Sequence, residues 1–134
     1  MEVKFVIPGD PVGKQRIRVN YKTKVEYTPS KTISYEKYVG HCYYGNHYFG
    51  DSPVGMSITI YKKIPTSVSK KKRELMLQHK ILPTKKPDLS NILKSIEDGL
   101  NGIAYKDDKQ IAHIKDIVEF YDDVPRVEVT LWEI

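Results

Sequence analysis

The residues most able to do chemistry in this chain are the aspartates Asp88, Asp98, Asp107 and Asp108. Cleaving a phosphodiester requires positive charge beside the phosphoryl oxygens while a water molecule attacks in line. Mg²⁺ can supply that charge, and it is usually held by one or two carboxylates together with waters and substrate oxygens. These aspartates are therefore candidate catalytic residues, with Asp88, Asp107 and Asp108 as the candidate metal ligands.

The strongest periodic signal in the sequence predicts a helix from Leu89 to Ile103, between these aspartates. Asp88 stands where an N-cap belongs, and Gly102 follows the last full turn as a stop signal. A helix of this length spans roughly 20 Å. Asp88 and Asp108 can therefore approach one another only if the chain folds back along the helix after Gly102, or if two subunits pair across it. The apolar residues of the helix fall within about 100° of arc, and they are Leu89, Ile92, Leu93, Ile96, Leu100 and Ile103.

A polar face lies opposite this apolar stripe and carries Asn91, Lys94 and Asp98. Lys94 is a candidate catalytic residue, because an ammonium here can neutralise charge that develops on a phosphate or can steer the attacking water. Plainer explanations remain open for the same residues. Lys94 and Asp98 can form a surface pair, Asp88 can be an ordinary N-cap, and Asp107–Asp108 can be a solvated turn.

The remaining pattern predicts one α+β domain over residues 1–134, with a mixed or antiparallel sheet packed against helices. Alternating apolar residues predict strands over 2–7, 54–62, 110–120 and 126–133, and the last two read as a hairpin. Further helices are expected over 32–44, with Ser30 or Thr32 as its cap, and over 69–79, starting at Ser67 or Ser69. Residues 13–28 are basic and rich in tyrosine, which predicts a loop or a ragged hairpin.

The charge distribution favours a polyanionic partner. The net charge is +5 and the isoelectric point is about 9.1. Basic residues dominate the first half of the chain, whereas acids outnumber bases after Asp88, and this division suggests a nuclease more than a simple binding module. The candidate DNA-backbone contacts are Lys14, Arg16 and Arg18, which alternate on one side of an extended segment, and the run Lys70, Lys71, Lys72 and Arg73.

Several function classes are excluded by what the sequence lacks. Its single cysteine, Cys42, allows no intramolecular disulfide and suggests a reducing environment. No secretion signal and no membrane-spanning run is evident, so we expect a cytoplasmic protein. There is no glycine-rich phosphate loop, no serine elbow and no zinc-protease helix. We therefore expect no small-molecule cofactor beyond the metal ion.

The run KPDLSNILKSIEDGLNGIAYKDDKQI resembles the signature of the RusA family of Holliday junction resolvases, PD-x-DN-x-x-K-x-x-x-D-x-L followed by DD-x-Q. Upstream, PGDPVGKQRIRV and YTPSKTISYEKYV resemble the family's KQRPR and YTP-x-x-T-x-x-YE segments. The resemblance implies a RusA-like fold and a homodimer that binds four-way DNA junctions and nicks them in recombination and repair. It also implies Mg²⁺ as the metal, with Mn²⁺ as a substitute, and a phage or prophage setting.

Matched position by position, the resemblance makes Asp88 the first essential acid and Asp108 the last, with Asp107 beside it. Asn91, Lys94, Asp98 and Gln110 match further motif positions. One match fails, because Ser90 stands where the motif has its second acid, and a hydroxyl is a poor replacement for a charged ligand. The alternative function is thus a branched-DNA-binding protein that cuts weakly. A structural or regulatory phage protein is a third class, and it predicts no preference for branched DNA.

Overall fold

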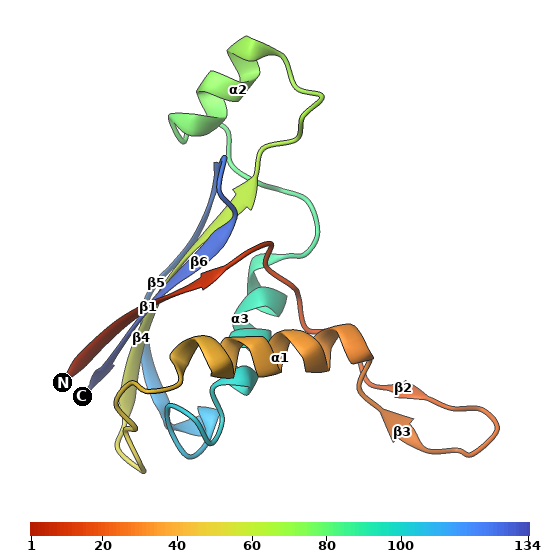
Figure 1. The fold of residues 1–134 in the computed structure, drawn as a ribbon, viewed down its shortest axis with the longest axis vertical. Coiled ribbons are helices and arrows are strands. Elements are labelled where there is room, and N and C mark those ends of the chain that lie inside the picture. Colours follow the sequence, from red (N-terminus) through yellow and green to blue (C-terminus); the bar gives the residue numbers. More distant parts are fainter.

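The computed structural model describes all residues from Met1 to Ile134, and it is built on one mixed four-stranded sheet (Figure 1). The strand order is β1-β6-β4-β5, with β4 parallel to β5 and antiparallel to β6, and with β1 antiparallel to β6. The predicted α+β fold is confirmed. The bounds are β1 Glu2–Pro8, β4 Val54–Lys63, β5 Ile111–Asp122 and β6 Arg126–Glu133.

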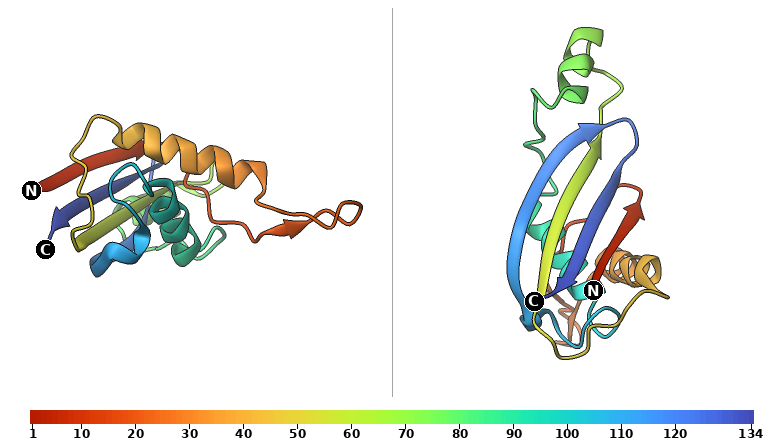
Figure 2. Two further views of the ribbon diagram at one scale, coloured as in Figure 1. Left: turned by 90° about the horizontal axis from the view of Figure 1, so that it is seen from below. Right: turned by 90° about the vertical axis from the view of Figure 1, so that its left-hand side faces the viewer.

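The expected hairpin of the last two strands is wrong, because β5 and β6 lie on opposite sides of β4 (Figure 2). The short connection after Asp122 crosses the end of β4 rather than closing a two-stranded ladder. β4 takes the central position because its alternating side chains Met56, Ile58 and Ile60 are fully buried. A strand buried in this way needs a hydrogen-bonding neighbour on each side. Adjacency in sequence did not reveal that pairing.

Two helices cover one face of the sheet, and the other face carries no helix (Figures 1 and 2). They are α1, Ser30–Tyr43, and α3, Leu89–Gly99. The main core lies between these helices and the sheet, where burial of apolar surface gives the domain its stability. Its fully buried members from α3 and the chain just after it are Ile92, Ile96, Leu100, Ala104 and Tyr105.

The start of α1 and the end of α3 both differ from the expected bounds. α1 begins after Pro29 with no side-chain cap, and Thr32 is instead fully buried, where its hydroxyl accepts a hydrogen bond from Gln15 N at 3.2 Å. α3 ends at Gly99, short of the expected Ile103, which is 39% exposed. After this end Gly102 adopts a positive φ of 76° and the chain reverses. This reversal returns residues 104–110 towards the helix.

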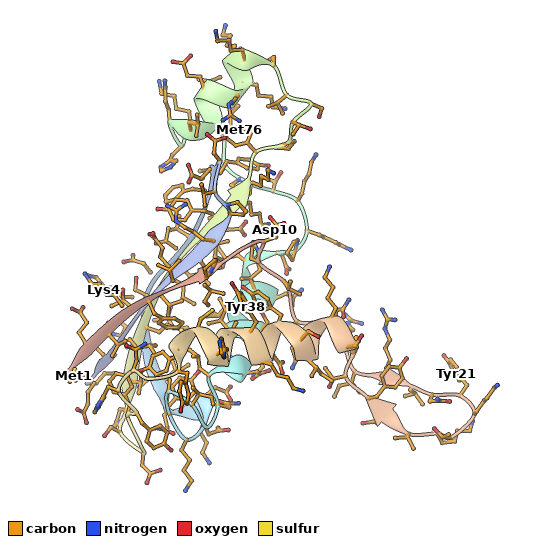
Figure 3. The ribbon with its side chains drawn as sticks, viewed as in Figure 1. Met1, Lys4, Asp10, Tyr21, Tyr38 and Met76 are labelled. Carbon is orange, nitrogen blue, oxygen red and sulfur yellow. The ribbon has the colours of Figure 1, made fainter.

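The smaller elements extend away from the main core at two ends of the molecule. The hairpin of β2, Arg18–Val19, and β3, Glu26–Tyr27, projects beyond α1, and its tip is marked by Tyr21 in Figure 3. This confirms the predicted ragged hairpin. The third helix, α2, spans Lys70–Leu77. It begins at Ser69, one of the two predicted caps, whose hydroxyl accepts a hydrogen bond from Lys72 N. It packs through Met76 on a separate small cluster.

None of the three helices is long and apolar enough to cross a membrane.

The crossing of α1 and α3 depends on two glycines. A Cβ atom at Gly99 would lie 2.8 Å from the carbonyl oxygen of Glu36 and 2.9 Å from Val39 Cβ. A Cβ atom at Gly40 would lie 3.0 Å from the carbonyl oxygen of Gly99. The helix backbones thus approach more closely than side chains would allow, and this approach brings the polar faces of the two helices together.

We expect Gly99→Ala to destabilise the protein although alanine favours helices. The propensity gain is about 1 kcal/mol, whereas forcing a methyl group against a backbone carbonyl costs about 1–3 kcal/mol. Urea unfolding measures the difference, and the midpoint should fall with an unchanged slope. An unchanged or higher midpoint would show that the two helices separate without cost.

Candidate active site

The reversal at Gly102 places Asp108 beside the second turn of α3. The Lys94 ammonium lies 3.0 Å from Asp108 Oδ2 and 3.0 Å from Asp98 Oδ1. Asn101 Nδ2 also donates a hydrogen bond to Asp108, with 3.2 Å between the nitrogen and Oδ1. The chain therefore folds back along the helix, as one of the two expected routes required. It joins Asp108 to Lys94 and Asp98, and this arrangement does not include Asp88.

A second lysine extends this arrangement towards α1. Lys14 Nζ lies 3.1 Å from Asp98 Oδ2 and 2.5 Å from Glu36 Oε1. Three segments distant in sequence are thereby joined through alternating charges: Glu36, Lys14, Asp98, Lys94 and Asp108. We call these five residues the ion-pair network. Its centre, Asp98, has a side chain only 16% exposed, so each of its oxygens has exchanged much of its water for an ammonium partner.

The electrostatics of the network favour the charged forms of Lys14, Lys94 and Asp108. Hydrogen bonding to Asp98, and then to Asp108, raises the pKa of Lys94 above its ordinary value in spite of partial burial. Burial alone would raise the pKa of the Asp108 carboxyl, but the hydrogen bonds from Lys94 and Asn101 outweigh it and hold the pKa below the usual value. Burial likewise opposes the charge on Lys14, and Glu36 and Asp98 more than compensate, so that its pKa is raised.

Glu36 and Asn101 are the site residues that the sequence analysis did not identify. Glu36 is part of the YTP-x-x-T-x-x-YE segment, so its signal was present without an assigned role. The structure explains why that segment and the KQ residues occur together, because Lys14 meets Glu36 and Gln15 meets Thr32. Asn101 had no comparable signal, because its hydrogen bond to Asp108 depends on the chain reversal.

Asp107 holds the loop before β5 rather than joining the network. It is the N-cap of the 3₁₀ turn η1, Asp108–Gln110, where its carboxylate accepts a hydrogen bond from Lys109 N at 3.1 Å. The Gln110 side chain accepts from Asp107 N and donates to the carbonyl oxygens of Gly50 and Ser52. The motif residues Asp107 and Gln110 therefore fix the position from which Asp108 reaches Lys94.

Asp88 lies apart from the network at the first residue before α3. Its side chain is exposed and makes no capping hydrogen bond, so the N-cap explanation accounts for its position but not for its carboxylate. It lines a groove of about 640 Å³ between residues 11–15 and 84–88, together with Lys31 and Asn91. Ser90 is also exposed. The candidate acid nearest this groove is thus free to contact a ligand.

The donor chemistry of the site suits a hard divalent cation, although the expected ligand set is not assembled. No group of three or more His, Cys, Asp or Glu side chains converges within this chain. The expected ligands Asp88, Asp107 and Asp108 therefore do not meet at one point. Asp98 and Asp108 do share one cation, the Lys94 ammonium. Carboxylate oxygens are the ligands that Mg²⁺ prefers, and this pair shows that the pocket accepts positive charge.

The chain is similar to known proteins over nearly its whole length. A family model described as Endodeoxyribonuclease RusA matches residues 8–132. The chain belongs to the RusA family. It is also 36% identical over 138 aligned positions to the uncharacterized protein YqaN of Bacillus subtilis (strain 168), covering 98% of this chain and 96% of YqaN. RusA membership implies endodeoxyribonuclease activity and supports action on Holliday junctions.

The expected DNA-binding residues of this RusA-family protein fall into three groups. Lys14 is committed to Glu36 and Asp98, so its expected role at the DNA backbone is not supported by its position. Arg73 is paired with Asp123. The others are exposed on the two projecting elements, Arg16 and Arg18 on the hairpin side and Lys70, Lys71 and Lys72 on α2. Figure 1 shows that these elements lie at opposite ends of the molecule.

Proposed function

We propose that this RusA-family protein is a metal-dependent endonuclease that resolves four-way DNA junctions by paired nicks in recombination and repair. The observation that carries the proposal is the Lys94 ammonium held between Asp98 and Asp108, at motif positions of a nuclease family. Carboxylates that share a cation beside an exposed polar helix face are suited to hold a metal ion at a phosphate.

In this proposal Asp108 holds Mg²⁺, or Mn²⁺ in its place, assisted by Asp98 and by the neighbouring Asp107. Bound there, the ion would stabilise negative charge on the phosphoryl oxygens. Lys94 provides a second positive charge at the same place and neutralises charge on the phosphate. Asp88 completes the set from the groove of a second subunit, because the two acids do not meet within one chain.

A homodimer is the economical assembly for this activity. A four-way junction is symmetric and requires two matching cuts, and a two-fold dimer presents one site to each scissile strand. Each subunit then contributes its own hairpin and its own α2 as arms around the branch point. The exposed basic residues on these arms bind phosphates and fix the register of the DNA without reading its sequence.

The hairpin arginines should contribute to affinity through counterion release. We expect Arg16→Ala/Arg18→Ala to weaken junction binding and to reduce the slope of log K against log salt concentration by about 0.9 for each phosphate that is no longer neutralised. Titration of a labelled junction at several salt concentrations gives the slope. Lys4→Ala/Lys115→Ala removes the same charge from exposed strand positions and serves as the control. Equal slopes in the two variants would remove the hairpin from the DNA interface.

The experiment that tests the function is cleavage of a synthetic four-way junction and a matched linear duplex with Mg²⁺, Mn²⁺ or EDTA. Paired cuts near the branch point that depend on the metal would support a resolvase. No preference for the junction over the duplex would contradict the proposed substrate, and it would favour the structural or regulatory class of protein.

A second function is favoured by one observation, the serine at position 90. This exposed residue adds no carboxylate beside Asp88, and the acids do not converge. A protein with this site would bind branched DNA and cut it weakly. Tight, junction-selective binding without cuts in either metal would support this function, and Ser90→Asp should then restore cleavage.

A further inference from the structure

The hydrogen bonds to the segment before Asp88 come from one side chain of the sheet. Residues 81–87 make no backbone–backbone hydrogen bond. The Lys62 ammonium donates instead to the carbonyl oxygens of Lys85, at 2.8 Å, and Pro87, at 2.5 Å. Lys62 stands near the end of β4, and its side chain is only 12% exposed. Its charge is therefore directed inward, away from solvent and away from the DNA-binding residues proposed above.

Glu119 of β5 completes this arrangement. Its Oε2 lies 3.0 Å from Lys62 Nζ, and its side chain is 11% exposed. Oε2 is buried and makes no hydrogen bond of good geometry, so the ammonium is its compensating charge. An ammonium has three donor hydrogens, and two carbonyl oxygens and one carboxylate oxygen surround this one. Lys62 thus faces three acceptors, two in the loop and one on Glu119, which compensates its charge.

The position of the Asp88 carboxylate depends on Lys62. Asp88 follows Pro87 directly, and its side chain has no hydrogen bond or ion pair that would hold it. The Asp88 carbonyl oxygen accepts a hydrogen bond from Ile92 N, which fixes the backbone only on the side that continues into α3. The chain entering from the other side is fixed by Lys62. A shift of the 85–87 backbone would therefore move the carboxylate along the groove wall.

We propose that Lys62 and Glu119 are positioning residues, which hold the backbone at Lys85 and Pro87 so that Asp88 faces the substrate groove. This inference rests on the proposed function for the role of Asp88, whereas the hydrogen bonds of Lys62 do not. Displacement of a catalytic group by about 1 Å can reduce a rate by about 100-fold. The pair thus acts on the chemical step, through a residue that neither member touches with its side chain.

The test replaces both members, because Lys62→Met alone would leave Glu119 as an uncompensated buried charge. Lys62→Met/Glu119→Gln retains the side-chain volumes and removes the ammonium and the carboxylate. Lys63→Met, at the exposed neighbouring position of the same strand, is the matched control. Each protein is treated with trypsin under native conditions, and cleavage after Lys85 is followed by mass spectrometry. Junction affinity, kcat and KM are measured on the same samples.

We expect the double variant to be cut after Lys85 several-fold faster than the wild type and the control, because local opening exposes the loop. Its kcat should fall by about 10- to 100-fold, the usual cost of removing the support behind a site residue. KM and junction affinity should be unchanged. Lys62→Arg, which keeps the charge and the donors, should recover slow proteolysis and most of kcat.

Two results would overturn the inference. Proteolysis after Lys85 at the wild-type rate in the double variant would show that Lys62 does not hold the loop. Faster proteolysis with an unchanged kcat would show that the loop position does not matter to Asp88. If the wild type itself cuts no junction, the proposed function fails, and the proteolysis arm still decides whether Lys62 holds the loop.

Discussion

Asp108→Asn is expected to abolish junction cleavage while leaving junction binding intact. The substitution keeps the shape of the side chain and removes the charge that faces Lys94 and, in the proposed function, the metal ion. Removal of one preorganised electrostatic group at a reacting phosphate costs at least about 10²–10³-fold in rate. Affinity measured without the metal ion should not fall, because removal of a negative charge beside bound phosphates then weakens no attraction.

The measurement is single-turnover cleavage of a four-way junction, with gel-shift affinity on the same preparation. Asp116→Asn is the matched control, since Asp116 is an exposed aspartate of β5 without an ion pair. Cleavage within a few-fold of the wild type by Asp108→Asn would remove Asp108 from the site. Loss of binding together with cleavage would indicate a folding defect rather than a missing ligand.

The same variant should show a small, pH-dependent loss of stability. The pKa of the Asp108 carboxyl lies below its usual value, so its ionised form stabilises the fold above the ordinary pKa of an aspartate. That contribution is lost as the pH falls through the lowered folded-state pKa, and the two proteins should then converge in stability. At neutral pH we expect less than about 1 kcal/mol, because Lys94 is half exposed and solvent screens the pair.

Asp88→Asn is expected to abolish cleavage to a similar extent without any change in stability. Its exposed side chain makes no capping hydrogen bond and no ion pair, so removal of its charge breaks no interaction within the folded protein. The two aspartate variants therefore differ in unfolding free energy and agree in activity. Urea unfolding and single-turnover cleavage of both variants test this contrast.

The double variant Asp88→Asn/Asp108→Asn should cut no more slowly than either single variant, since groups that act as a unit give non-additive losses. Additive losses would place the two aspartates in separate steps. Retained cleavage in both single variants would show that the site assignment as a whole is wrong.

The sequence alone predicted most elements of this protein and the family to which it belongs. The period of α3 placed Ile92, Ile96 and Leu100 in the core and Lys94 on the opposite face, because the helical repeat fixes which residues share a side. The strands over 54–62 and 126–133 were predicted from their alternation for the same reason. The cap of α2 was narrowed to Ser67 or Ser69, because a cap is a local hydrogen bond, and the structure has Ser69.

Only the tertiary structure decided which of these elements meet. The apolar alternation of β5 and β6 is compatible with a hairpin. In the structure the buried strand β4 lies between them and pairs with both. Lys14 is a second example. Its basic neighbours suggested a contact with the DNA backbone, whereas the packing of α1 and α3 places it between Glu36 and Asp98. Lys62 gave no signal at all, since its partners Lys85, Pro87 and Glu119 are distant in sequence. Period and capping are properties of neighbouring residues, whereas strand pairing and ion pairing depend on burial, which the whole chain determines at once.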